Sequence, residues 1–144
     1  MVLASIGFFA LAVFGLGALS VATDRDIIAV EGLGQAPGVA GMILAVATFA
    51  LSLGATLRRP RPSFGSALVI ALVTALLHLA TVWLAVLAAS GDLVIATVVA
   101  GDLVRGGASA VIVVAAAVAG WSGIALRRTR SGRPRWPWER DEGE

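Results

Sequence analysis

The sequence contains no cysteine, lysine, tyrosine or asparagine, and it has a single histidine, His78. Without cysteine, the chain can hold no disulfide bond, no iron–sulfur cluster and no thiolate-bound metal. One histidine leaves too few nitrogen ligands for a zinc site. We therefore expect neither a cofactor nor a metal site.

Charged residues are also scarce. They make up 14% of the 144 residues, whereas hydrophobic residues make up 58%, and the mean hydropathy is +0.93. A protein that folds in water needs more polar side chains than this to cover its surface. Lipid must cover most of this chain instead, so the composition indicates an integral membrane protein.

The apolar residues are gathered in four stretches, at about 2–22, 38–57, 66–89 and 107–126. At about 1.5 Å per residue, a helix of about twenty residues crosses a hydrocarbon core of about 30 Å. Each stretch is apolar on every side, whereas the strands of a membrane barrel are shorter and alternate with polar residues. We therefore expect an all-α integral membrane protein, an antiparallel bundle of four transmembrane helices within residues 1–126.

The segment between the third and fourth stretches has a different pattern. At 100° per residue, Thr97, Gly101, Asp102 and Arg105 share one arc of a helix, and aliphatic residues cover the remainder. This pattern predicts a short helix that lies at the outer membrane interface. The alternative is a longer fourth helix that begins near Leu93 and projects out of the bilayer.

All eleven basic residues are arginine, and nine of them follow the second and fourth stretches. Because arginine-rich connections stay in the cytoplasm, we expect both of these regions and both termini on that side. The inner side then has nine arginines against four carboxylates, and the outer side has two against five. The residue bias is typical of a GC-rich bacterial genome, so the expected location is the bacterial plasma (inner) membrane.

Arginines beside a span bind anionic headgroups, and tryptophan prefers the membrane interface. Residues 127–144 are accordingly expected to form a cytoplasmic tail that lies along the inner leaflet and is disordered at its end. Nucleic-acid binding is not expected, because the membrane orientation already explains the arginines. The expected headgroup anchors are Arg58, Arg59, Arg61, Arg127, Arg128, Arg130, Trp136 and Trp138.

The first stretch has an alternative interpretation as a secretory signal, since Ser20-Val21-Ala22 resembles a small-x-small cleavage site after an apolar run. Against this, no basic residue precedes the run, which is longer than the usual signal core of about 7–15 residues. Cleavage would leave three spans with the same orientation.

His78 is the one titratable side chain deep within an expected span, about midway along the third stretch. Ionisable groups inside a membrane often mark functional sites, and a histidine there can relay protons, respond to pH or ligate haem. The structural alternative is a neutral imidazole that a hydroxyl on the same or a neighbouring helix satisfies. Thr74, one turn away, and Thr48 on the second stretch are the expected partners.

The string Gly120-Trp121-Ser122-Gly123 resembles the G-x-S-G sequence around the nucleophile of rhomboid intramembrane proteases. His78 would be the only base available to Ser122, yet the two differ in membrane depth by about 10 Å along the helix axes. The match covers four residues, and the six-helix framework of those proteases is absent. We therefore do not expect an enzyme.

Three charged residues lie at the expected outer face. Asp92, Asp102 and Arg105 are candidates for contact with a partner or a small cation, or they form solvated pairs worth less than about 1 kcal/mol each.

The sequence also contains a short internal match, in which residues 54–59 (GATLRR) correspond to residues 123–128 (GIALRR). Duplication of a hairpin produces such a match, and so does the rule that places arginine pairs at both inner span ends.

These observations favour a non-enzymatic membrane protein that acts by helix packing, as an accessory or scaffold subunit of a cell-envelope complex. Its partner is another membrane protein or a second copy of the chain. No expected span carries a carboxylate or an arginine, so the chain lacks the central acid of the small four-helix multidrug exporters that it resembles in size. The alternative is a small transporter or channel, for protons or a small solute, that uses His78.

Overall fold

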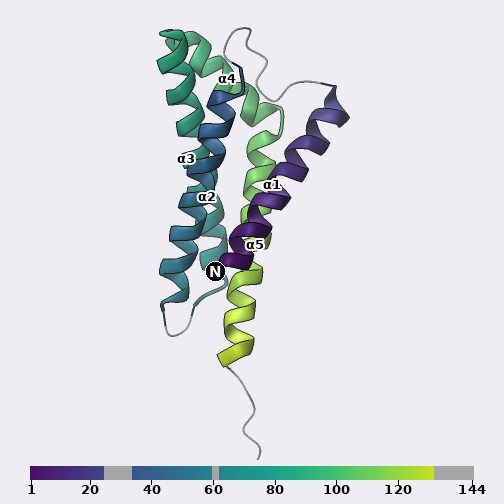
Figure 1. Cartoon of the computed structure of the whole chain (residues 1–144), viewed down its shortest axis with the longest axis vertical. Helices are drawn as coiled ribbons and strands as arrows, with labels where there is room; N and C mark the ends of the chain where they lie inside the picture. The colour runs from purple at the N-terminus through teal and green to yellow at the C-terminus, as the bar shows by residue number, and fades with distance from the viewer. Residues whose placement is uncertain (25–33, 60–61, 132–144) are drawn as a thin grey trace, which may run out of the picture.

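The computed structural model describes residues 1–24, 34–59 and 62–131, apart from the side chains of residues 130 and 131. These residues form five helices and no strand: α1 (Val2–Thr23), α2 (Ala36–Leu57), α3 (Gly65–Ser90), α4 (Leu93–Arg105) and α5 (Ala108–Ser131). All but α4 are long and apolar enough to cross a membrane, α5 over Ala108–Thr129. The prediction of an all-α membrane bundle with a separate short helix is confirmed (Figure 1).

The helix ends follow from local backbone chemistry. Pro37 lies in the first turn of α2, where a missing N–H group breaks no helical hydrogen bond. Gly91 ends α3 in the left-handed conformation, at φ 67°. Gly107, at φ 89°, separates α4 from α5, so the alternative of one long fourth helix is wrong.

The four long helices run alternately in opposite directions, and the helices that lie side by side are not all neighbours in the sequence (Figure 1). In space, α5 packs between α1 and α3, and α2 and α4 pack on α3. The contact between α1 and α2 is small by comparison. Its principal feature is the stack of Phe8 on Phe49, with ring centroids 4.7 Å apart and an interplanar angle of 21°.

The core is made mainly of small and branched side chains, together with two phenylalanines. Its largest fully buried members in the main cluster are Phe8, Phe49, Leu53, Ile112 and Ile124, surrounded by alanines of α1, α3 and α5. Lipid gives apolar helices no hydrophobic reason to associate, so close packing of such residues must stabilise the bundle. Because Phe8 is part of this core, α1 is an integral element of the fold.

The short helix α4 packs on α3 through a second buried cluster. Ala96, Val99 and Leu103, spaced three and four residues apart, contact Val82 and Val86 of α3. Asp92 caps the helix, since its Oδ1 accepts hydrogen bonds from the backbone N–H groups of Val94 at 2.7 Å and Ile95 at 3.3 Å.

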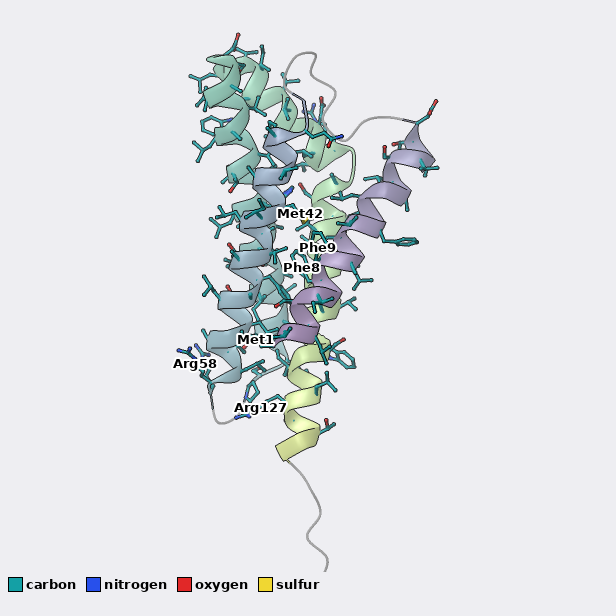
Figure 2. All side chains as sticks on the ribbon, viewed as in Figure 1. Met1, Phe8, Phe9, Met42, Arg58 and Arg127 are labelled. Atoms are coloured by element: carbon teal, nitrogen blue, oxygen red, sulfur yellow. The ribbon has the colours of Figure 1, made fainter. Side chains whose placement is uncertain are left out.

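The alternating directions gather like charges at the ends of the bundle. Arg58 and Arg59 follow α2, and Arg127 and Arg128 lie near the end of α5, at what we call the arginine end (Figure 2). Asp24, Asp92 and Asp102 lie at the opposite, aspartate end, which also holds Arg105. Of the other expected anchors, Arg61, Trp136, Trp138 and the side chain of Arg130 lie outside the described residues.

Candidate functional site

His78 lies on the face of α3 that packs against α2, and its side chain is only 5% exposed. The residue opposite is Gly41, where an added Cβ would lie 3.2 Å from both Cδ2 and Nε2 of the imidazole. The same Cβ would lie 2.6 Å from Cγ2 of Val82. A glycine at this position of α2 therefore makes the room that the histidine ring occupies.

The expected hydroxyl partners do not reach the imidazole. The Nδ1 atom of His78 and the Oγ1 atom of Thr74 are both buried, and neither has a hydrogen-bond partner among the described residues. Gly41, which faces the ring, is seven residues from Thr48, or about 10 Å along α2. His78 and Thr74 thus place two unsatisfied polar groups one turn apart on the buried face of α3, which is energetically unfavourable unless they acquire a partner.

Ser122 and His78 lie at different levels of the bundle. Ser122 donates its hydroxyl hydrogen to the carbonyl oxygen of Val118 at 2.8 Å. Its neighbour Gly120 packs on Ala67, because a Cβ at Gly120 would lie 3.7 Å from that residue. Ala67 and His78 are eleven residues apart on α3, which corresponds to about 16 Å. The two side chains therefore do not form a nucleophile–base pair in this structure.

At the aspartate end, the three predicted interaction residues have different surroundings. Asp92 is the N-cap of α4 and so has a structural role. Asp102 and Arg105 are exposed, and no ion pair joins them. Thr97, on the same arc of α4, accepts a hydrogen bond from Nε1 of Trp83 at 3.4 Å, which ties α4 to α3. Binding of a partner or a cation by Asp102 and Arg105 stays a prediction.

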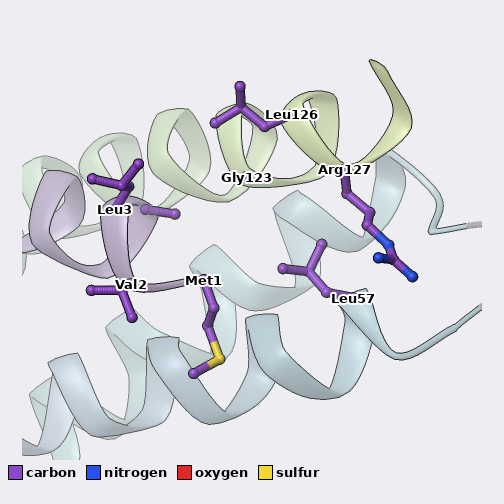
Figure 3. Close-up of a pocket in the computed structure, with 8 residues that line it drawn as sticks. Met1, Val2, Leu3, Leu57, Gly123, Leu126 and Arg127 are labelled. Atoms are coloured by element: carbon purple, nitrogen blue, oxygen red, sulfur yellow. The ribbon is translucent and has the colours of Figure 1, made fainter. Parts of the chain in front are cut away.

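The arginine end contains a groove that the sequence analysis missed. It has a volume of about 580 Å³ and is lined by Met1, by residues 2–4 of α1, by Leu57 of α2, and by Gly123, Leu126 and Arg127 of α5 (Figure 3). The match between segments 54–59 and 123–128 could have indicated the groove, because both segments supply residues to this region. Only the fold shows that the first turn of α1 lies against them.

Two adjacent arginines have different environments at this end of the bundle. Arg127 lines the groove. The guanidinium carbon of Arg128 instead lies 4.7 Å from the centre of the Phe64 ring, in a cation–π contact. Phe64 in turn lies beside Trp121, with ring centroids 6.0 Å apart.

Comparison with known proteins identifies a family for this chain. No curated protein and no solved structure matches the chain. One family model does match, over residues 1–144, and so includes every helix of the bundle as well as His78 and the groove. The chain belongs to the family of unknown function DUF6121.

Proposed function

We propose that this protein is a non-enzymatic membrane protein that acts by helix packing, as an accessory or scaffold subunit of a cell-envelope complex. The observation that supports the proposal is the outward stripe of α1, which consists of Leu3, Gly7, Ala10, Phe14, Gly17 and Val21. Its members recur every three or four residues, so they form one continuous line along the helix.

The outward stripe lies opposite the face with which α1 joins the bundle. Ala4, Phe8 and Ala12 are the buried residues of α1. Phe14 and Val21, in contrast, are 77% and 85% exposed. A line of residues that runs the length of a helix and combines small with large side chains is the pattern with which membrane helices interlock.

The glycines of the stripe favour contact with a protein partner over contact with lipid alone. An added Cβ at Gly7 or Gly17 would meet no atom within 4 Å, so packing inside the chain does not require a glycine at either position. At Gly15, by contrast, the added Cβ would lie 2.6 Å from Cγ1 of Val111. A glycine in a helix lowers its stability by about 1 kcal/mol relative to alanine, a cost that close approach of another helix can offset.

The proposal includes an orientation in the membrane. Because arginine-rich connections remain in the cytoplasm, the arginine end faces inward, both termini lie inside and the aspartate end faces outward. The described arginines Arg58, Arg59, Arg127 and Arg128 then meet the anionic inner leaflet of a bacterial plasma membrane. A partner that docks on α1 lies beside it within the bilayer.

The test is copurification from native membranes under mild extraction. We expect the tagged protein to carry a stoichiometric membrane-protein partner or a second copy of itself. The double variant Gly7→Leu, Gly17→Leu fills the stripe and should release that partner, because both positions are open in the monomer. Ala47→Leu, at an exposed position of α2, is the matched control and should retain it. A solitary, monodisperse particle from native membranes would contradict the proposal.

The buried polar pair supports a second candidate, a small transporter or channel for protons or a small solute. His78 and Thr74 present unsatisfied polar atoms at mid-span, where such groups commonly contact a translocated ion or solute. Flux across liposomes of defined internal pH, with the wild type and with His78→Ala, tests this candidate. Equal flux in the two preparations would eliminate it.

A further inference from the structure

We propose that the groove at the arginine end binds one anionic phospholipid molecule, with an acyl chain along its apolar wall and the phosphate at Arg127. The groove shares Leu3 with the outward stripe of α1, but Gly7 and Gly17, the positions that test the stripe, do not line it. Such a site also differs from general attraction of arginines to the membrane surface, because it assigns one guanidinium group and one cavity to one lipid molecule.

The matched segments 54–59 and 123–128 build the groove by helical geometry. In each segment a glycine is followed three residues later by leucine and four residues later by arginine, so the three share one face of a helix. On α5 these residues are Gly123, Leu126 and Arg127, and all three line the groove. The next arginine falls on another face, which explains why Arg128 lies over Phe64 instead.

The glycines admit the first turn of α1 between α2 and α5. A Cβ at Gly54 would lie 2.9 Å from Sδ of Met1. A Cβ at Gly123 would lie 3.2 Å from Cβ of Ala4 and 3.2 Å from Cδ2 of Leu53. Leu57 of α2 and Leu126 of α5 each lie three residues beyond these glycines, and both line the groove together with residues 1–4 (Figure 3).

The shape and chemistry of the groove match one end of a phospholipid. Its volume of about 580 Å³ lies within the range of about 300–1,000 Å³ that holds organic ligands. Val2, Leu3 and Leu126 are 66%, 73% and 51% exposed, so the groove opens outward from the bundle. The side chains that line it are apolar except that of Arg127, and backbone groups supply the rest of its polar surface. Arg127 lies near the end of the apolar part of α5.

The positive charge of Arg127 favours a lipid with an anionic headgroup. A guanidinium group donates paired hydrogen bonds to phosphate oxygens, and it holds its charge at any physiological pH. Arg58 and Arg59 add positive charge at the same end of the bundle, whereas the guanidinium group of Arg128 lies over the Phe64 ring. A ligand that is apolar along most of its length and anionic at one end satisfies both parts of the site, and an anionic phospholipid has this form.

The first experiment measures lipid binding to the delipidated, full-length protein by native mass spectrometry. Phosphatidylglycerol and phosphatidylcholine with identical acyl chains are the probes, and phosphatidylglycerol should bind more tightly, as a single molecule. Arg127→Gln should weaken that binding about fivefold, the effect of losing one arginine at an anionic surface. Arg128→Gln removes the same charge from the adjacent position and should leave binding within twofold of wild type. Equal losses in the two variants would overturn the proposal, since they would indicate diffuse attraction.

The second experiment separates the lipid from a free phosphate. Val2→Trp adds a ring to a wall residue that is already exposed, so it fills the groove without disturbing the core. It should weaken the binding of both phospholipids while leaving the thermal unfolding transition in place. Inorganic phosphate at millimolar concentration should not displace phosphatidylglycerol. Displacement by phosphate, or unchanged lipid binding in Val2→Trp, would contradict an acyl-chain site.

Discussion

Replacing Gly41 with alanine introduces a methyl group at a point of the α2–α3 contact that has no room for it. The new Cβ would lie 2.6 Å from Cγ2 of Val82, whereas carbon atoms in contact are ordinarily about 3.5–4.0 Å apart. The overlap is therefore about 1 Å. Val82 is 1% exposed and His78 is 5% exposed, so neither side chain can move aside without displacing others.

The expected change in unfolding free energy has two parts of opposite sign. Overpacking a filled core costs about 1–3 kcal/mol. Alanine also favours a helix over glycine by about 1 kcal/mol, and this gain must be measured separately. Gly7→Ala supplies the control, because its Cβ meets nothing within 4 Å. We expect Gly41→Ala to be less stable than Gly7→Ala by about 1–3 kcal/mol.

A double-mutant cycle assigns that loss to one contact. Val82→Ala removes Cγ2, so the methyl group of Gly41→Ala then has space, and the double variant should be more stable than the two single changes predict. The coupling free energy should be about 1–3 kcal/mol, as for other residues in direct contact. Reversible unfolding by SDS in mixed micelles, followed by tryptophan fluorescence, measures all four proteins. Additive effects, or a Gly41→Ala variant as stable as Gly7→Ala, would refute the α2–α3 packing.

Three other variants test separate parts of the fold. Asp92→Ala should destabilise α4 by about 0.5–2 kcal/mol through loss of the N-cap, seen as faster amide exchange in its first turn, while Asp92→Asn should stay close to wild type. Phe8→Leu should lower the unfolding free energy by about 0.5–1.5 kcal/mol more than the loss of buried apolar area alone would, because it removes the stack on Phe49. The same substitution made in a Phe49→Leu background should lower it by less. Gly107→Ala should lower the thermal midpoint, with a cost of about 1–3 kcal/mol, because a side chain is strained at φ 89°. An unchanged amide exchange rate in Asp92→Ala would contradict the first expectation, and additive losses from Phe8→Leu and Phe49→Leu would contradict the second. An unchanged thermal midpoint in Gly107→Ala would contradict the third.

The positions of the spans were predictable because length and hydropathy alone determine them. The predicted stretches 38–57 and 66–89 became Ala36–Leu57 and Gly65–Ser90, and the fourth helix extends beyond residue 126 to Ser131. The short helix at residues 93–105 followed from its polar arc. The arginine end followed from the alternation of helix direction, which the charge pattern already implied.

The contacts between helices were not predictable, because each span is apolar on every face and carries no stripe to mark its inward side. The sequence gives no reason for α1 to pack mainly on α5, or for Gly41 rather than Thr48 to face His78. Such choices depend on the shapes of small residues across an interface, which are visible only when both helices are in place. The groove is a product of the same choices, since it requires the start of α1 between α2 and α5.

The central claim is that the four long helices cross a bilayer with the arginine end inside. Because the chain contains no cysteine, Ser63→Cys and Ser90→Cys each introduce a unique thiol, at opposite ends of α3 and at exposed positions. Labelling of spheroplasts with a membrane-impermeant maleimide should modify Ser90→Cys directly, and Ser63→Cys only after the membrane is permeabilised. Labelling of both positions from the same side would contradict the membrane-spanning fold, and labelling in the reverse order would contradict the orientation.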